Sequence, residues 1–535
     1  MRNYKKEWLP HLKGSIPPEA KRNRISLYTI ALEGWRRGLS LKFYQFNDER
    51  QHKKIMYSFS SQDSIHYFTE SSGDLNTIQA FDICHNKGLT EKYLAKHQVP
   101  IPKGRVFTRE ATIEHIIDYA NNMKYPLVVK PTDGSGGKGV FANVKSKKEL
   151  VDAVKFIWKN EEFEELIVQQ FVEGDEVRVY VLEDKVLAAG NRLPANIVGD
   201  GHHTIIQLIR NKNELRKNTP HLHHRPIRVD NEVKSLIAAA NYTLDSVLEK
   251  GERLYLRKIS NVSTGGESID VTDTLTAEQR DIAVRATMSI PGLTHCGVDM
   301  MINQQTGDTV VLEVNTKPGI GLHLFPTEGN ARDIPKALID YYFPETVHNK
   351  YQKNIFFDLQ TVFDVLNDGS VNELEITPPP NATLEVVEYI ISSNLELLEF
   401  HSKVQKYILE NSIHGSIKKM DDEKICMIAA HEKSETIEQL QGFLEERSSL
   451  LQIEHIQVKE YNAPIKLGFS VIDGLQSMSL VELEVEHKQS IKESKIMEKE
   501  VARLRKRIKQ MKQSKAWKVT APLRIVTSKL KEKRP

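Results

Sequence analysis

The sequence YPLVVKPTDGSGGKGV, residues 125–140, places a glycine-rich loop between two strand-like runs. Residues 127–130 precede the loop, and the β-favouring residues 140–144 follow it. The glycines satisfy the pattern GxGxxG, but a dinucleotide-binding loop must open a helix. Walker A is excluded because Lys138 is followed by glycine and not by Ser or Thr. The stretch predicts a glycine-rich hairpin that can close over phosphates, with an ordinary mobile hairpin as the alternative.

A second stretch, VVLEVNTKPGIGLH at residues 310–323, predicts a cluster of oxygen ligands. Its apolar strand delivers Glu313 and Asn315, which alternation places on the same face. Asp299 ends another apolar stretch and could supply a third ligand. Mg²⁺ prefers hard oxygen ligands, and nucleotide phosphates can complete its shell. For any one of these residues alone, a solvated acidic edge is the competing interpretation.

Five motifs in a fixed order connect these stretches to a known family. The chain resembles the ATP-grasp carboxylate-amine ligases, most closely cyanophycin synthetase and the ligase half of the bifunctional glutathione synthetases, over residues 86–344, about half its length. The motifs are VVKP with its glycine loop, VQQFVEGDEVRVYV at 168–181, NRLPANIVGDGHHTI at 191–205, LRKISNVSTGGESIDVTD at 256–273 and EVNTKPGIGLH at 313–323.

The resemblance implies an ATP site made by residues around the glycine loop and the second motif. Lys87 and Lys130 match lysines that face the phosphates, and Glu176 matches the residue that holds the ribose hydroxyls. Gln169 stands where many relatives carry a glutamate that reads the adenine edge. The implied ATP-binding residues are Lys87, Lys130, Gly134, Ser135, Gly136, Gly137, Lys138, Gln169, Phe171, Val172 and Glu176.

The resemblance also implies a magnesium site of two ions, at which Mn²⁺ could substitute. The matching metal ligands are Asp299, Glu313 and Asn315. Arg257 and Arg192 lie where relatives keep cations near an acyl phosphate. Val298 stands where some D-alanine:D-alanine ligases carry an arginine, so Arg257 is the predicted replacement.

The chemistry of such a ligase explains these groups. A carboxylate is a poor electrophile at neutral pH, so it first takes the γ-phosphoryl group of ATP, and an amine then attacks the acyl phosphate. This transfer depends on positioning and on neutralising charge, while a lid keeps water away. A polar string beside Arg257 could hold the acceptor carboxylate or phosphate, or could be a plain glycine-rich turn. The string comprises Asn261, Ser263, Thr264, Gly265 and Gly266.

Composition predicts a multidomain protein without a dominant charge. A chain of 535 residues corresponds to about three or four domains, and its formal net charge is +2. The three cysteines suggest neither a disulfide framework nor a zinc site. No apolar run of about 18 residues occurs, so we expect a cytoplasmic protein, with peripheral membrane contact as an option. The expected partners are small-molecule carboxylate and amine substrates, and no specific nucleic acid is predicted.

The fold class predicted is mixed α/β (α+β), built around an ATP-grasp fold. We expect a small N-terminal α/β domain, acting chiefly through packing, with substrate selection as the alternative. The predicted N-terminal domain is 1–107, and the ligase domain is 108–345, although the family match begins near residue 86. After it we expect a β-hairpin and linker at 346–380 and an acylphosphatase-like domain at 381–472. A basic coiled-coil helix and tail are expected at 473–535.

Residues 381–472 predict the strand and helix order of a ferredoxin-like fold. Their spacing resembles acylphosphatase, but the segment ISSNLELLEF at 391–400 lacks the arginine and glycines of that family's phosphate loop. Lys419 falls where the family has its catalytic asparagine. The resemblance therefore implies a degenerate domain that serves binding or assembly.

The C-terminal region shows steps of three and four from Leu480 to Met511, which predicts a coiled coil and a homodimer, although the polar positions His487, Ser490 and Ser494 weaken the seam. Residues 488–535 contain 17 Lys or Arg and 4 Glu. Such a basic helix could meet an anionic membrane surface or an acidic polymer, or it could simply be solvated. The ending SKAWKVTAPLR, residues 514–524, resembles a tail of bacterial surface-polysaccharide glycosyltransferases.

Three functions follow from these features. The first is an ATP- and Mg²⁺-dependent ligase acting on an amino acid, a peptide or a cell-envelope precursor. The alternative is a non-catalytic ATP-binding scaffold in surface-polysaccharide assembly, and the least favoured is an acylphosphatase. Both lysines and all three metal ligands favour the ligase, because a scaffold needs nucleotide binding alone. The identity of the carboxylate and amine, and single or repeated addition, stay open.

Overall fold

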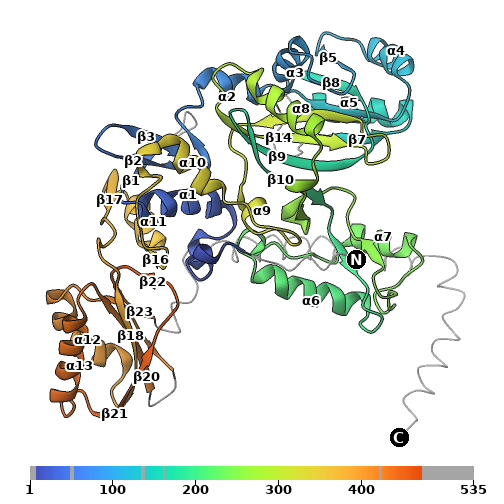
Figure 1. Cartoon of the computed structure of the whole chain (residues 1–535). Coiled ribbons are helices and arrows are strands. Elements are labelled where there is room, and N and C mark those ends of the chain that lie inside the picture. Colours follow the sequence, from blue (N-terminus) through green and yellow to red (C-terminus); the bar gives the residue numbers. More distant parts are fainter. Residues whose placement is uncertain (1–7, 48–52, 134–138, 161–162, 421–423, 473–535) are drawn as a thin grey trace, which may run out of the picture.

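The computed structural model describes residues 8–47, 53–133, 139–160, 163–420 and 424–472 of the chain. An N-terminal sheet and a C-terminal sheet lie on one side of the molecule, and the sheets formed by residues 104–315 lie on the other (Figure 1). Within these described residues, no helix has the length and apolar character that crossing a membrane requires.

The N-terminal sheet has the order β17-β1-β2-β3-β4 and is antiparallel throughout. Its last strand in sequence, β17, comes from a segment more than 300 residues after β1 and joins the sheet through the pair Leu41 and Ile376. Three helices pack beside this sheet, namely α1, α10 and α11. The elements are α1 (Ile25–Arg36), β1 (Ser40–Asn47), β2 (Lys53–Ser60), β3 (Ile65–Thr69), β4 (Ser72–Gly73), α10 (Ile334–Tyr342), α11 (Leu359–Asp368) and β17 (Glu373–Ile376).

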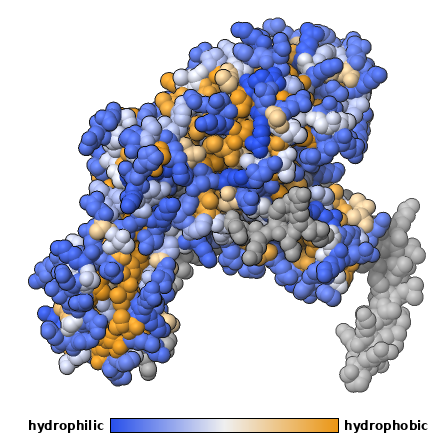
Figure 2. All heavy atoms as spheres, in the orientation of Figure 1, coloured by the Kyte–Doolittle hydropathy of each residue, from blue (hydrophilic) through white to orange (hydrophobic). Residues whose placement is uncertain are grey.

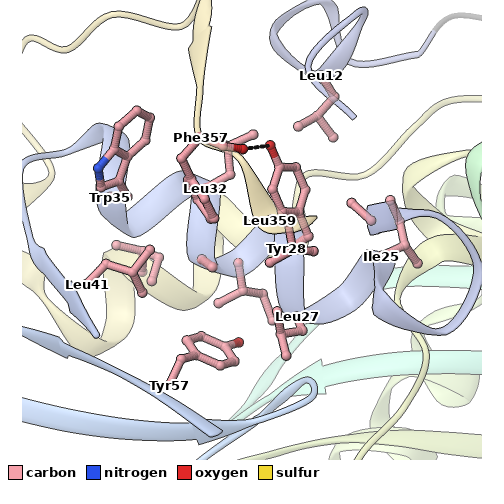
Figure 3. Close-up of a cluster of buried hydrophobic side chains, with 14 of the residues drawn as sticks. Leu12, Ile25, Leu27, Tyr28, Leu32, Trp35, Leu41, Tyr57, Phe357 and Leu359 are labelled. Atoms are coloured by element: carbon pink, nitrogen blue, oxygen red, sulfur yellow. Dashed lines mark hydrogen bonds between the residues drawn. The ribbon is translucent and has the colours of Figure 1, made fainter. Parts of the chain in front are cut away.

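Helix α1 is buried at all twelve of its positions, because the sheet, α10 and the chain near Phe357 surround it. Figure 3 shows its aromatic residues against that chain, where Tyr28 Oη donates to the carbonyl oxygen of Phe357 at 3.3 Å. The Trp35 indole N–H donates to Thr377 O at 2.8 Å. Helix α1 therefore holds segments from residues 357 and 377 against the N-terminal part of the chain.

Replacing Gly34 by Ala is expected to destabilise the protein by about 1–3 kcal/mol, as overpacking does in other cores. A Cβ atom at Gly34 would lie 2.4 Å from Cε1 of Phe59, whose side chain is fully buried. The matched control is Gly442→Ala in helix α13 (Ser434–Glu446), where nothing lies within 4 Å, and alanine should stabilise by about 0.5–1 kcal/mol through helix propensity. Urea denaturation measures both changes, and equal effects would contradict the packing argument.

A four-stranded antiparallel sheet of order β5-β8-β6-β7 follows, with α4 and α5 packed on it. Strands β6 and β7 flank the glycine loop and pair through Leu127 with Val144 and Val129 with Phe141. The predicted strand-loop-strand hairpin is therefore confirmed, while loop residues 134–138 lie outside the described part. The elements are β5 (Gly104–Thr108), α4 (Ile113–Met123), β6 (Leu127–Pro131), β7 (Phe141–Val144), α5 (Lys147–Lys159) and β8 (Glu165–Gln170).

The central sheet has the order β13-β10-β9-β14-β15 and is also antiparallel. Helix α8 packs against β14 and β15, and α2 and α3 approach β15. Val298, Val311 and Val314 belong to the core under these strands. The elements are α2 (Ile78–His85), α3 (Lys87–Lys96), β9 (Asp175–Leu182), β10 (Lys185–Leu193), β13 (Glu267–Asp270), α8 (Ala277–Met288), β14 (His295–Ile302), β15 (Thr309–Asn315) and α9 (Gly321–Leu324).

A small lobe interrupts this sheet between β10 and β13. Its two-stranded sheet pairs β11 (Asn196–Val198) with β12 (Arg253–Tyr255), and its helices are α6 (Ile205–Lys217) and α7 (Asn231–Ala239). Its own core contains Ile197, Ile209 and Ile237.

Residues 385–460 form strand, helix, strand, strand, helix and strand in the predicted order, and the sheet order β21-β18-β20-β19-β23 is ferredoxin-like with one added strand. Hydrophobic side chains gather on the visible sheet side of this unit (Figure 2). The elements are β18 (Glu385–Ser393), α12 (Leu397–Glu410), β19 (His414–Lys419), β20 (Lys424–His431), α13 (Ser434–Glu446), β21 (Ile453–Glu460) and β23 (Phe469–Ile472). Strands β16 (Ile355–Phe356) and β22 (Ile465–Lys466) pair in parallel and join this unit to the N-terminal one.

The predicted hairpin within 346–380 is wrong. Asp358 caps helix α11 by accepting hydrogen bonds from the amide nitrogens of Gln360 and Thr361, and Gly369 ends the helix in a left-handed conformation. The Asn-Asp-Gly sequence is therefore a helix terminus, and the strand after it joins the N-terminal sheet. The predicted boundary at residue 107 also falls within β5, which belongs to the next sheet. The predicted coiled coil and basic tail lie outside the described residues.

Candidate active site

Asp299, Glu313 and Asn315, the oxygen triad, lie together on two neighbouring strands. Asp299 of β14 faces Glu313 of β15 in the strand register, and Asn315 Nδ2 donates to Asp299 Oδ2 at 3.3 Å. Val314 points to the opposite side and is 1% exposed. The alternation predicted from sequence therefore brings three candidate metal ligands to one face of the sheet.

The two predicted phosphate lysines, Lys87 and Lys130, form the lysine pair beside this triad. Lys87 Nζ lies 3.3 Å from Glu313 Oε1, and its backbone N–H donates to Thr132 O at 2.9 Å. Lys130 Nζ lies 3.6 Å from Glu91 Oε1. Burial lowers the pKa of Lys130, and the nearby Glu91 carboxylate opposes that shift. A buried cation can attract an anionic ligand such as phosphate, while the neighbouring carboxylates oppose that attraction.

Glu91 is a site residue that sequence reasoning missed. Its Oε1 accepts from Gln169 Nε2 at 2.8 Å, and burial raises the pKa of its carboxyl group. Gln169 is 2% exposed, and Phe171 and Val172 are half-buried after the same strand. The missed signal was helical spacing, because Glu91 lies one turn after Lys87 on α3. The predicted adenine-reading amide is thus held by a carboxylate that also meets Lys130.

Arg178 of β9 is the second missed residue. Its Nε and Nη2 each donate to a separate oxygen of Asp299 at 2.6 Å. Burial alone would raise the pKa of Asp299, but the Arg178 charge holds that pKa below its ordinary value. Arg178 of β9 is the cross-strand neighbour of Asp299 on β14. The sequence of a single strand does not show which residue of another strand it will pair with.

Arg192 lies between Asp299 and Glu176. Its Nη1 lies 3.5 Å from Asp299 Oδ2 and donates to Glu176 Oε1 at 2.6 Å. Glu176 also accepts from the Ser260 hydroxyl. Glu176, predicted to hold ribose hydroxyls, therefore links β9 to β10 and to the chain before the polar string.

The structure does not bring Arg257 to the oxygen triad. Its guanidinium donates to Glu232 Oε2 at 2.6 Å and to Asp230 Oδ2 at 2.5 Å. These carboxylates belong to the start of α7, so Arg257 ties that helix to the chain after β12. Among the described residues, the guanidinium groups that contact Asp299 are those of Arg178 and Arg192, which corrects the prediction that Arg257 is the replacing cation.

The polar string folds into a compact turn. Asn261 Oδ1 accepts from Ser263 N at 2.9 Å and from Ser263 Oγ at 2.8 Å, and Gly266 N donates to Asn261 O at 2.9 Å. Thr264 Oγ1 donates to Asn261 O at 3.1 Å. Gly265 has φ +106°, and a Cβ atom there would lie 2.8 Å from Ile227 Cγ1. This close approach requires glycine and fixes the turn against the small lobe.

A cavity of about 420 Å³ opens between this turn, Arg178 and Arg192, and we call it the arginine cavity. Side chains from the N-terminal unit, from α1 and from the small lobe also line it. Its charged lining residues are Arg22, Arg178, Arg192, Arg225, Lys317 and Glu70. The excess of cations suits an anionic ligand.

The N-terminal unit packs against the rest of the protein and also supplies side chains that line this cavity. Arg225 Nη1 donates to His221 O at 2.9 Å, and its Nη2 donates to the Asn23 side chain. The Nε atoms of Arg22 and Arg192 are buried and have no hydrogen-bond partner in the part of the chain that the structure describes. The N-terminal unit therefore lines the arginine cavity, and substrate selection by this unit stays a prediction.

The oxygen triad fits a Mg²⁺ ion in its chemistry, because two carboxylates and an amide oxygen are hard donors. In the described ranges no group of three His, Cys, Asp or Glu side chains is placed to hold a metal. Both oxygens of Asp299 already accept from Arg178. The triad therefore provides a partial shell, which phosphate oxygens would complete.

Two buried histidines behind the site make stability depend on pH. His295 contacts the hydroxyl groups of Tyr180 at 3.0 Å and Tyr342 at 3.2 Å. Burial lowers the pKa of His295, and likewise that of His323, to about 3. The unfolded chain takes up protons on these rings below about pH 6.5, whereas the folded chain does not. Acidification therefore favours unfolding.

We expect the free energy of unfolding to fall by about 1.4 kcal/mol per pH unit for each ring between pH 6 and 4. Urea denaturation at a series of pH values measures this slope. His323→Gln should remove one ring's share of the slope, while His97→Gln, at an exposed position, should leave it unchanged. An unchanged slope in His323→Gln would refute the assignment.

Comparison with known proteins finds similarity to a family over part of the chain. Residues 84–320 match the ATP-grasp domain family. Cyanophycin synthetase of Crocosphaera subtropica is 34% identical over 274 residues, which are 50% of this chain and 31% of the relative. The glutathione biosynthesis bifunctional protein of Listeria monocytogenes is 31% identical over 291 residues, 53% of this chain and 38% of the relative.

Among solved structures, a bifunctional glutathione synthetase from Pasteurella multocida is similar with a TM-score of 0.44 and 28% identity, over 54% of this chain and 40% of that chain. The chain thus spans 31% and 38% of the lengths of the two curated relatives. The matched region includes the lysine pair and the oxygen triad.

Proposed function

We propose, from the premise that residues 84–320 form an ATP-grasp domain, that the protein is an ADP-forming ligase that joins a carboxylate to an amine. The observation that carries this proposal is the contact between Lys87 Nζ and Glu313 Oε1 at 3.3 Å. This contact supports the proposal because the Lys87 ammonium group, which would bind phosphate, lies next to the oxygen triad, so that both could act on one nucleotide. The names of the relatives, a synthetase and a biosynthesis protein, support the same class of reaction.

In this proposal the lysine pair holds the phosphates of ATP, and Glu91 keeps Lys130 in place. The oxygen triad would hold Mg²⁺, two ions by family resemblance, with Mn²⁺ as a substitute. When bound, the metal neutralises charge on the transferring phosphoryl group. Arg178 keeps Asp299 ionised, because its charge lowers the pKa of that carboxyl group.

The arginine cavity would receive the carboxylate substrate. Arg178 and Arg192 stand at its end nearest Asp299, where their charges would stabilise the acyl phosphate. Asn261 and Ser263 form its other side. The amine would then attack the acyl carbon and release phosphate. An amino acid, a peptide or a cell-envelope precursor carries the carboxylate and amine that this scheme requires.

The test is ADP release by the purified full chain with ATP, Mg²⁺ and separate pools of amino acids, small peptides and polyamines. We expect release that requires one pool and falls to background in Glu313→Gln. A matched control is Glu328→Gln, because Glu328 contacts Arg253 at 3.4 Å in the small lobe and does not belong to the triad. Tight ATP binding with no release in any pool would instead favour a nucleotide-binding scaffold.

A further inference from the structure

The arginine cavity is lined by two separate groups of guanidinium side chains. The first group is Arg178 and Arg192, near the oxygen triad, and carboxylates partner both of them. The second group is Arg22 of the N-terminal unit and Arg225 of the small lobe, which we call the arginine pair. Arg22 lies outside the matched segment 84–320, so the family match does not account for this second group.

The arginine pair has no carboxylate partner within the described ranges. Arg225 donates to His221 O at 2.9 Å and to the side-chain oxygen of Asn23, and both of these acceptors are neutral. The Nε of Arg22 is buried and has no hydrogen-bond partner among the described residues. Burial lowers the pKa of Arg225, and the nearby charge of Arg22 lowers it further. Two like charges therefore lie near each other, an arrangement that a negatively charged ligand group would stabilise.

The backbone at Arg22 is a second, independent observation. Its φ is +63°, in the left-handed region that is disfavoured for a residue with a β-carbon. Residues in this conformation persist where the surrounding structure determines them, and they cluster at ligand sites. The short helix Arg22–Arg24 packs against the short helix Pro220–Leu222, and Arg225 follows the latter. The fold thus holds the arginine pair together although this requires a disfavoured backbone conformation.

The other charges of the lining do not cancel the arginine pair. Glu70 is exposed, and it has no ion pair with any described residue. Lys317 Nζ lies 5.1 Å from the centre of the Phe81 ring, which has no net charge. The arginine pair and Lys317 therefore face one lining carboxylate, an excess of two positive charges. Both members of the pair are half-buried, so a ligand in the cavity can reach their guanidinium groups.

We propose that the arginine cavity takes a substrate with two anionic groups, of which the reacting carboxylate lies at Arg178 and Arg192 and the second, a carboxylate or a phosphate, lies at the arginine pair. The place of the reacting carboxylate rests on the proposed function. Guanidinium groups bind either anion through charge-assisted N–H donors. The cavity volume of about 420 Å³ lies in the range of small-molecule sites. The N-terminal unit and the small lobe thus select a diacid over a monoacid.

The test is calorimetric binding of linear dicarboxylates, from succinate to suberate, to the full chain, each compared with its own monoamide. The monoamide keeps the length and one carboxylate but lacks the second charge. We expect a dicarboxylate of matching length to bind about 10-fold or more tightly than its monoamide, the usual effect of a hydrogen bond to a charged group. The phosphonocarboxylate of the same length then identifies the second group, because tighter binding than the dicarboxylate indicates a phosphate and weaker binding a carboxylate.

Arg22→Asn and Arg225→Gln should each abolish the preference for the dicarboxylate and leave the affinity of the monoamide unchanged. Asparagine tolerates the left-handed conformation, so Arg22→Asn removes the charge without adding backbone strain. Arg22→Lys retains the charge and should keep part of the preference. Arg285→Met, on α8 outside the cavity lining, should change neither affinity. If one variant of the arginine pair fails to fold by circular dichroism, the other carries the test.

Equal affinity of every dicarboxylate and its monoamide would overturn the proposal, as would a preference that survives in both Arg22→Asn and Arg225→Gln. The experiment measures binding without turnover, so it is independent of the ADP assay. ADP release that shows no preference for a diacid would refute the second anionic group alone. Selective diacid binding without ADP release in any pool would refute the ligase reaction and leave the arginine pair as an anion site.

Discussion

Lys130→Met is expected to lower the rate of ADP formation by about 100-fold or more, the usual effect of removing one group that stabilises transition-state charge. Lys130 is 7% exposed, and its Nζ lies 3.6 Å from Glu91 Oε1. Methionine keeps the length of the side chain and removes the charge. The measurement is steady-state ADP release with the pool that supports turnover, together with nucleotide affinity from calorimetry. Lys145→Met, at an exposed position just after β7, should retain the full rate.

If Lys130 had only a structural role, the outcome would be different. Loss of the lysine leaves the Glu91 carboxylate without its cation, which destabilises a buried site. The double variant Lys130→Met/Glu91→Gln removes that unpaired charge, so it should recover stability while remaining inactive. Recovery of ADP formation in the double variant would show that Lys130 acts only through the fold. A rate within threefold of the wild type in Lys130→Met would contradict the phosphate-binding role altogether.

Arg178→Met is expected to lower the free energy of unfolding by about 3–5 kcal/mol, because it leaves a buried carboxylate without its partner. The side chains of Arg178 and Asp299 are 15% and 7% exposed, and two hydrogen bonds of 2.6 Å join them. The pKa of Asp299 should also rise once the Arg178 charge is gone, because Arg192 and Asn315 alone then oppose the effect of burial. Urea denaturation followed by circular dichroism measures the change in stability.

The controls for Arg178→Met compare the loss of a buried ion pair with the loss of an exposed one. Arg285→Met breaks a pair with Asp281 whose side chains are 38% and 59% exposed, and such pairs contribute about 1 kcal/mol or less. The double variant Arg178→Met/Asp299→Asn should recover part of the lost stability, because the neutral amide tolerates burial better. Equal decreases in the free energy of unfolding for Arg178→Met and Arg285→Met would show that the Arg178–Asp299 ion pair does not stabilise this sheet.

The sequence predicted those parts of the site that lie within one strand or one loop. Glu313 and Asn315 share a face because alternation is a property of a single strand, and the glycine hairpin follows from two strand-like flanks. Arg178 was missed because its partner is set by the register between β9 and β14. Arg257 was misassigned because its position in a motif does not say which carboxylates the folded chain brings to it.

Fold prediction failed where local signals competed. The Asn-Asp-Gly sequence near residue 368 is typical of a hairpin turn, but Val362, Phe363 and Leu366 have helical spacing and are buried together. The cap at Asp358 and the left-handed glycine at 369 then end the helix at both sides. The return of β17 to the N-terminal sheet could not be read locally, because it depends on a pairing across more than 300 residues.

Helix α1 reaches two cavities of the molecule. Ile25 and Ser26 at its start line the arginine cavity, and Trp35 near its end lines the cavity of about 700 Å³ between the N-terminal unit and the ferredoxin-like unit. A rise of about 1.5 Å per residue separates these ends by about 15 Å. Any rigid-body displacement of this helix, which is buried along its whole length, would move both ends together. If ligands in the two cavities were coupled in this way, thermodynamic linkage would require reciprocity: the factor by which occupancy of one cavity changes affinity in the other is the same in both directions.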